Sequence, residues 1–110
     1  MTRLTTHVLD TATGRPAGGV TVRLHSAAAP ATPVACAVTD ADGRALLVSG
    51  DLASGVYDLV FAMGPYFANP PAAPAFFGDI IIRVGIDAAQ SHYHIPLLAS
   101  PWSYTTYRGS

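Results

Sequence analysis

Hydrophobic and polar residues alternate along most of this chain, and that period of two is typical of β-strands rather than helices. Two N-terminal segments show it clearly, Leu4 to Asp10 and Val20 to Ser26. In the first, the faces carry Leu4, Thr6 and Val8 on one side and Thr5, His7 and Leu9 on the other. In the second, Val20, Val22 and Leu24 form the apolar face. We predict a strand in each segment, with one face towards a core.

The same period continues to the C-terminus and predicts five or six further strands. They are Val34 to Asp40, Arg44 to Val48, Val56 to Ala62, Ile80 to Ile86 and Tyr93 to Leu97, with Ser103 to Arg108 as the sixth candidate. Asp42-Gly43 lies between two of them and predicts a tight hairpin, because glycine readily supplies the positive φ that such a turn needs. Arg44 therefore stands directly after a turn.

The predicted inward residues follow from the apolar positions of each strand. They are Val34, Cys36 and Val38, then Tyr57, Leu59 and Phe61, and then Tyr93, Ile95 and Leu97. Ile80 to Ile86 is apolar at almost every position except Arg83, which indicates burial on both faces and a partner for one of them. The Pro-rich stretch from Gly64 to Pro74 leaves room for at most one helical turn. We predict an all-β antiparallel sandwich of seven to eight strands with at most one short helix.

Composition excludes several classes of partner. The 110 residues are expected to form one domain, residues 1–110. All 6 basic residues are Arg and all 7 acidic residues are Asp, a balance of −1 without the basic stripe that nucleic acids or anionic membranes require. The prolines between 65 and 74 would break any membrane helix. Because Cys36 is the single cysteine and the N-terminus does not resemble a signal peptide, we expect a cytoplasmic protein.

Three of the four histidines lie on outward strand faces that also carry apolar residues. His7 lies opposite Leu4 and Val8, and His92 and His94 lie opposite Tyr93 and Ile95. These outward faces also carry leucines, which indicates that a second subunit covers them. His25 reads as a surface histidine. A zinc site formed by His92, His94 and His7 is an alternative, although no other ligand spacing supports it.

Three blocks of the sequence resemble the 5-hydroxyisourate hydrolases, the enzymatic branch of the transthyretin-like family. They are Leu4-Thr5-Thr6-His7-Val8-Leu9-Asp10-Thr11-Ala12, Thr39-Asp40-Ala41-Asp42-Gly43-Arg44, and His92-Tyr93-His94-Ile95-Pro96-Leu97-Leu98 with the terminal Tyr107-Arg108-Gly109-Ser110. The first block, the second histidine of the third block and the last four residues distinguish the hydrolases from the hormone carrier transthyretin. Gly78 stands where the family usually has Pro, and the segment from Gly64 to Pro74 is shorter and richer in Pro than the family's helical segment.

The resemblance implies a transthyretin-like fold and a homotetramer, a dimer of dimers, with substrate sites at the dimer-dimer interface. It implies no cofactor and no metal. It assigns catalytic positions to His7, Arg44, His94 and Ser110, and substrate contacts to His7, Arg44, Tyr107 and Arg108. His92 matches no functional position of the family.

The implied reaction hydrolyses the lactam bond of 5-hydroxyisourate to 2-oxo-4-hydroxy-4-carboxy-5-ureidoimidazoline, a step of urate and purine breakdown. A histidine with a pKa near neutrality can carry out the proton transfers. A guanidinium can bind the substrate carbonyl and stabilise the oxyanion that develops from it. Two alternatives remain. One is a non-catalytic transthyretin-like protein that binds a small ligand, and the other is a prealbumin-like accessory or adhesion module.

Overall fold

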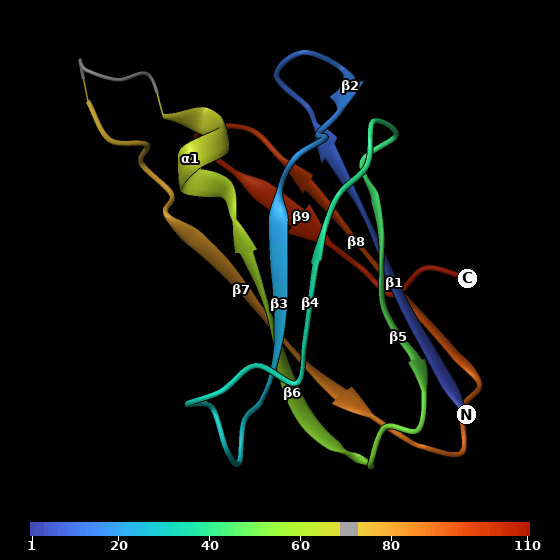
Figure 1. Cartoon of the computed structure of the whole chain (residues 1–110). Coiled ribbons are helices and arrows are strands. Elements are labelled where there is room, and N and C mark those ends of the chain that lie inside the picture. Colours follow the sequence, from blue (N-terminus) through green and yellow to red (C-terminus); the bar gives the residue numbers. More distant parts are fainter. Residues whose placement is uncertain (69–72) are drawn as a thin grey trace.

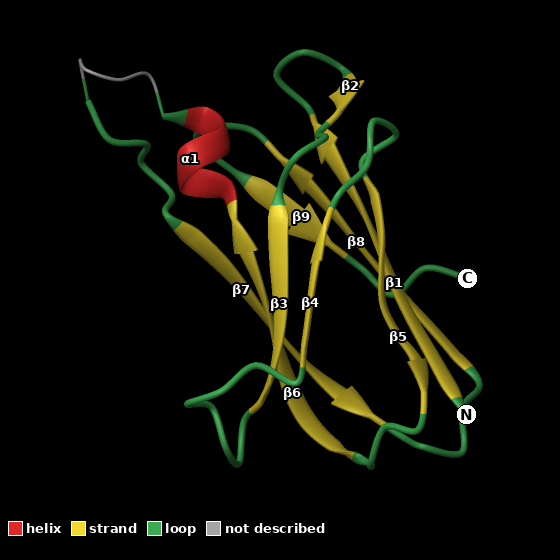
Figure 2. Cartoon of the chain, in the orientation of Figure 1, coloured by secondary structure: helices red, strands yellow, loops and turns green. Residues whose placement is uncertain are grey.

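The chain folds into two β-sheets that face each other, with one short helix at one end (Figures 1 and 2). The computed structural model describes residues 1–68 and 73–110. The strands within these residues are β1 (Thr2–Asp10), β2 (Arg15–Pro16), β3 (Thr21–Ser26), β4 (Ala35–Val38), β5 (Arg44–Gly50), β6 (Gly55–Ala62), β7 (Asp79–Ile86), β8 (His92–Ala99) and β9 (Tyr104–Thr106), and the helix is α1 (Met63–Phe67). This architecture confirms the predicted sandwich.

One sheet contains β4, β3, β6 and β7 in that order, and all its pairs are antiparallel. The other is organised around β1. This strand pairs along one edge with β5 and β2, and along the other with β8, which in turn pairs with β9. The β1–β8 pair is parallel, while the other pairs of this sheet are antiparallel. The first strand, β1, therefore lies beside the penultimate strand, β8, so residues from the two ends of the chain can share one surface.

The core fills the space between the sheets with the residues that the alternation predicts. Leu4 and Val8 of β1, Leu24 of β3, Leu59 of β6 and Leu97 of β8 are fully buried. Thr6, also buried, donates a hydrogen bond from Oγ1 to the carbonyl of Ile95 at 2.6 Å. The inward positions of β1 are therefore fixed, and its odd-numbered positions from Arg3 to Leu9 point outward.

The predicted inward face of the third strand is wrong. Cys36 is exposed, and Val38 retains 58% of its surface, whereas Ala35 and Ala37 pack against the core. The register explains the inversion. Ala35 and Ala37 lie opposite Leu24 and Val22 of β3, and directly paired residues share a face of a sheet. The pairing with β3, and not the size of the side chains, determines which face of β4 is buried.

The predicted hairpin at Asp42-Gly43 is also wrong, although the turn is present. Gly43 has φ 75°, and its N–H donates to the carbonyl of Asp40 at 2.9 Å. The strands on either side belong to different sheets, because β4 pairs with β3 and β5 pairs with β1. The turn therefore carries the chain from one sheet to the other.

Burial on both faces of Ile80 to Ile86 is not found in the single chain. Ile80 and Ile86 face the core, whereas Ile81 keeps 55% of its surface and Arg83 is exposed and paired with Asp58. A two-layer sandwich covers only one face of each sheet, which explains the difference. The helix α1 supplies the single turn expected after Gly64, and residues 69–72 of the Pro-rich segment lie outside the described residues. No helix of the described residues is long and apolar enough to cross a membrane.

Candidate active site

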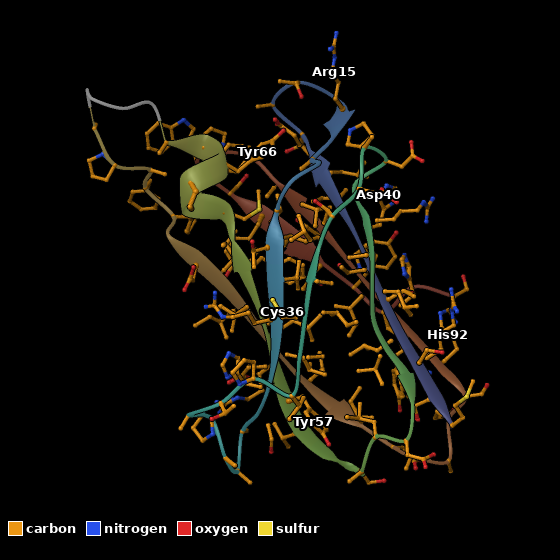
Figure 3. The ribbon with its side chains drawn as sticks, in the orientation of Figure 1. Arg15, Cys36, Asp40, Tyr57, Tyr66 and His92 are labelled. Carbon is orange, nitrogen blue, oxygen red and sulfur yellow. The ribbon has the colours of Figure 1, made fainter. Side chains whose placement is uncertain are left out.

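A cavity of about 410 Å³ lies on the outer face of the β1 sheet. Its lining comes from β1, β5, β8 and the turn before β5, and consists of Arg3, Thr5, Thr6, Asp40, Arg44, Ala45, Leu46, His92 and His94. Two of the predicted catalytic residues, Arg44 and His94, are in this set. Figure 3 shows His92 on the side of β1 that faces away from β3 and β4. The predicted outward direction of His92 and His94 is therefore confirmed.

The register of the central strands brings the site residues together. Thr5 lies opposite His94 across the parallel β1–β8 pair, and His7 lies opposite Arg44 across the antiparallel β1–β5 pair. A β-bulge between Leu4 and Thr5 shifts the β5 register just before these positions. The result is that His7, Arg44 and His94 come from three adjacent strands on one outward face.

The turn before β5 sets the start of the Arg44 strand. The carboxylate of Asp40 accepts hydrogen bonds from the backbone N–H of Asp42 at 2.9 Å and of Arg44 at 3.0 Å. The Asp42 carbonyl in turn accepts a hydrogen bond from His7 Nε2 at 2.8 Å. Because a carbonyl can only accept, Nε2 of His7 carries a proton, and in the neutral ring Nδ1 holds the lone pair. This turn thus orients both His7 and Arg44.

His94 is the most perturbed of the histidines. Partial burial lowers its pKa below the ordinary value, and the positive charges of Arg44, His7 and His92 lower it further. A histidine with a lowered pKa is neutral at pH 7 and can accept a proton. Nδ1 of His94 is 2.8 Å from the hydroxyl of Thr5. Within the described residues Nε2 has no protein partner, so it is the nitrogen available to a ligand.

The end of the chain is held against His94. The N–H of Gly109 donates to the carbonyl of His94 at 2.7 Å, and the two residues form a β-bridge. A Cβ on Gly109 would lie 2.5 Å from Cδ2 of the His94 ring. Only glycine therefore allows the tail to pass so close to this imidazole. Ser110 follows and is exposed.

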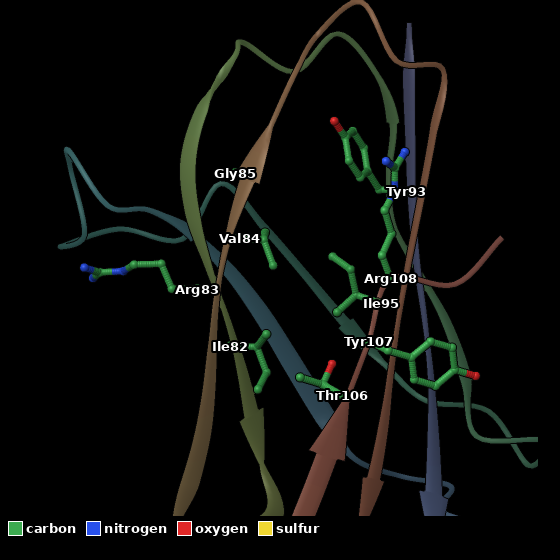
Figure 4. Close-up of a pocket in the computed structure, with 9 residues that line it drawn as sticks. All are labelled: Ile82, Arg83, Val84, Gly85, Tyr93, Ile95, Thr106, Tyr107 and Arg108. Carbon is green, nitrogen blue, oxygen red and sulfur yellow. The ribbon is translucent and has the colours of Figure 1, made fainter.

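Tyr107 and Arg108 line a different cavity, of about 310 Å³, at the opening between β7 and β8 (Figure 4). The Arg108 guanidinium lies 4.4 Å from the centroid of the Tyr93 ring, a cation–π contact. Tyr93 faces the core side of β8, opposite to His94. The Tyr107 ring is directed away from Ile82 and Val84 in Figure 4 and is 58% exposed. In one subunit, these two residues lie apart from the cavity of Arg44 and His94.

The remaining candidates are also placed by the structure. His25 lies on the other sheet, where its Nδ1 donates to the carbonyl of Pro30 at 2.8 Å, so it is no part of the site. Within residues 1–68 and 73–110, no three His, Cys, Asp or Glu side chains form a group that could hold a metal ion. Arg3 and Thr5 were not predicted as cavity residues. Their positions four and two residues before His7, on the same strand face, were the signal that could have found them.

Comparison with known proteins identifies the family of the chain. Residues 4–109 match the HIUase/Transthyretin family. The chain belongs to this family. It is 47% identical to a 5-hydroxyisourate hydrolase of Deinococcus radiodurans over 113 residues, which cover 97% of this chain and 95% of that protein.

Two solved structures of the family show the same fold. The 5-hydroxyisourate hydrolase of Klebsiella pneumoniae is 37% identical with a TM-score of 0.85, and all of both chains is covered. The transthyretin of sea bream in complex with thyroxine is 31% identical with a TM-score of 0.82, over 96% of this chain and 93% of that chain. The HIUase/Transthyretin family thus includes both an enzyme and a hormone-binding protein that resemble this chain.

Proposed function

We propose that this chain is a hydrolase that opens the lactam ring of 5-hydroxyisourate by attack of water, without a cofactor. The observation that carries the proposal is the convergence of His7, Arg44 and His94 from three adjacent strands onto one outward face. The 47% identity to the Deinococcus radiodurans hydrolase over nearly the whole of both chains supports it. The product would be 2-oxo-4-hydroxy-4-carboxy-5-ureidoimidazoline.

In this proposal His94 is the general base. Its lowered pKa keeps the ring neutral at pH 7, and Nε2, which has no hydrogen-bond partner among the described residues, can take a proton from water. The water oxygen then bonds to the lactam carbon, and the C–N bond breaks when the ring nitrogen receives a proton from Nδ1 of doubly protonated His7, whose Nε2–H stays bonded to the Asp42 carbonyl. His7 lies beside Arg44 across the β1–β5 pair, and solvent carries the proton taken up by His94 back to His7.

Arg44 binds the substrate and stabilises the oxyanion. Its guanidinium stays charged and presents a planar fork of N–H donors, which matches the carbonyl and nitrogen edge of the heterocycle. Negative charge develops on the carbonyl oxygen during the attack, and a fixed positive group that meets it there lowers the barrier. Arg3 lines the same cavity and adds to its positive potential.

The C-terminal residues complete the proposed site in an assembly. Gly109 pairs with His94, and in the proposal the hydroxyl of the following Ser110 orients the imidazole or the water. Tyr107 and Arg108 are the proposed additional substrate contacts. Leu46 on the cavity rim is 46% exposed, which favours a covering subunit. We therefore include in the proposal a homotetramer with sites between dimers. The single cysteine supports a cytoplasmic location, which is also part of the proposal.

The second candidate is a non-catalytic protein that binds a small ligand in the same place. The likeness to sea bream transthyretin, solved with thyroxine, favours it. Two titratable histidines beside an arginine are unnecessary for binding an apolar ligand, whereas they suit proton transfer and oxyanion stabilisation.

The direct test is to generate 5-hydroxyisourate from urate with uricase and to follow its decay by absorbance. Catalytic amounts of the protein should accelerate the decay, and the acceleration should persist in EDTA. A decay rate equal to the spontaneous rate would overturn the hydrolase proposal. Loss of the acceleration in EDTA would show that a metal takes part.

A further inference from the structure

The hydroxyl of Thr5 lies between two imidazoles. Its Oγ1 is 2.8 Å from Nδ1 of His94 and 3.3 Å from Nε2 of His92. The two rings stand on the same face of β8, nearly parallel at 24°, with centroids 6.4 Å apart. The parallel β1–β8 register produces the arrangement, because it places Thr5 opposite His94 and Arg3 opposite His92. One hydroxyl thus contacts both histidines.

We propose that Thr5 is a positioning residue that holds the His94 ring and selects which of its nitrogens carries the proton, with His92 as the second partner of the same hydroxyl. The inference rests on the proposed hydrolase function, because it assigns a role within that reaction. The family resemblance implies no functional role for His92. Its contact with Thr5 gives it a role in this proposal.

The proton count supports a definite direction for the two hydrogen bonds. A hydroxyl has one proton to donate and two lone pairs to accept with. When His94 donates from Nδ1 to Thr5, the lone pair of His94 is on Nε2, the nitrogen without a hydrogen-bond partner among the described residues. The Thr5 proton is then free to be donated to Nε2 of neutral His92. In this state the Thr5 hydroxyl both accepts and donates a hydrogen bond, and His94 is ready to act as a base.

A proton on His92 favours the opposite direction. Both ring nitrogens of His92 then carry protons, so Nε2 donates to Thr5. The Thr5 proton turns towards Nδ1 of His94, and a neutral His94 must then carry its proton on Nε2. In that form His94 presents a donor to the cavity instead of a lone pair. The charge on His92 thereby biases His94 between base and donor.

Other charged groups lie near His94, and three of them, Arg44 of β5, His7 of β1 and His92 of β8, lower its pKa independently of Thr5. Arg3 of β1 and Asp40 of the turn line the same cavity. A variant that removes only the Thr5 hydroxyl leaves all these charges in place. Its effect on His94 is therefore separable from the electrostatic effects.

The first experiment compares Thr5→Val, Thr5→Ser and the control Thr21→Val in the full chain. Valine keeps the shape and strand preference of threonine but removes the hydroxyl, and Thr21 is half-buried on β3 in the other sheet. We expect Thr5→Val to lower kcat by about tenfold or more with KM changed by less than about threefold. Thr5→Ser should recover most of the rate, and Thr21→Val should behave as wild type.

The second experiment reads the His94 tautomer directly from the ¹⁵N chemical shifts of the imidazole nitrogens, which need no turnover. Wild-type protein should show a protonated Nδ1 on neutral His94, and Thr5→Val should shift the equilibrium towards protonated Nε2. His92→Gln should raise the pKa of His94, since it removes a neighbouring positive charge, whereas His25→Gln should leave it unchanged.

The two proposals fail in different ways. A wild-type protein that does not accelerate 5-hydroxyisourate decay overturns the hydrolase function. An active wild-type protein whose Thr5→Val variant keeps both the kcat and the protonated Nδ1 overturns the role of Thr5.

Discussion

At the scale of single residues, the proposed mechanism depends most on His94, because three separate features act on this residue. Its burial and its positively charged neighbours lower its pKa, the hydroxyl of Thr5 contacts Nδ1, and the backbone of Gly109 binds its carbonyl. His25 has the same side chain on the other sheet, with an ordinary hydrogen bond to Pro30. The difference between the two histidines therefore lies in their surroundings.

The lowered pKa of His94 predicts the pH dependence of turnover. Because its pKa lies below the ordinary value of about 6.5, the neutral ring persists at pH values where an ordinary histidine is already protonated. On the acidic side, kcat should therefore begin to decrease only below pH ~6.5. A kcat profile recorded with the uricase-coupled assay checks this. An acidic limb above pH ~7 would contradict the assignment of His94 as base.

Gly109 provides a second test at this scale. Gly109→Ala places a Cβ against the His94 ring, so the ring or the tail must move. We expect kcat/KM to fall by about tenfold or more, because small displacements of a catalytic group are costly, while the melting temperature changes little. Gly50→Ala is the matched control, since a Cβ there meets nothing within 4 Å. Equal activity of the two variants would show that the tail does not position His94.

At the scale of elements, the sequence predicts most strands and their inward residues because alternation directly reports a half-buried strand. The prediction fails where burial depends on the strand that pairs with the segment. Cys36 and Val38 look more suited to a core than Ala35 and Ala37, yet pairing with β3 decides the face. The destination of the strand after Gly43 is likewise set by pairing with β1, a long-range contact that a local turn signal cannot report.

The turn at Gly43 positions both strands that it joins. Substitution of Gly43 should therefore strongly lower the free energy of unfolding. Gly14 and Gly43 have nearly the same φ, 74° and 75°, but a Cβ on Gly43 would clash with the carbonyl oxygen of Val8. Gly14→Ala should therefore cost about 1 to 2 kcal/mol, the strain of the left-handed region alone. Gly43→Ala should cost clearly more. Urea unfolding of both variants gives the comparison, and equal losses would contradict the clash.

At the scale of the whole molecule, the parallel β1–β8 pair places the two ends of the chain on one surface. The face that carries His7, Arg44 and His94 was predictable from alternation together with the family resemblance. The separation of Tyr107 and Arg108 from that cavity was not, because their positions depend on how the tail packs against Tyr93. In the proposed tetramer, a neighbouring subunit covers this outer face.

The tail predicts that additions at the C-terminus damage function more than folding. Gly109 makes its contact with His94 at the sheet surface and not in the core. Deletion of Arg108 to Ser110, or a C-terminal tag, should therefore lower turnover strongly and the melting temperature little. An N-terminal tag serves as the control. Full activity in a protein with a C-terminal tag would show that the terminal residues have no role in the reaction.

The most direct measurement is the rate of 5-hydroxyisourate decay with variants of the three converging residues and one matched control. We expect His7→Asn, Arg44→Ala and His94→Asn each to lower kcat/KM by about a hundredfold or more, since each removes a proton transfer or an oxyanion contact. His25→Asn, on the other sheet, should match wild type. Near-normal turnover by the His94→Asn and Arg44→Ala variants would contradict the account, because the outer-face cavity would then not be the active site.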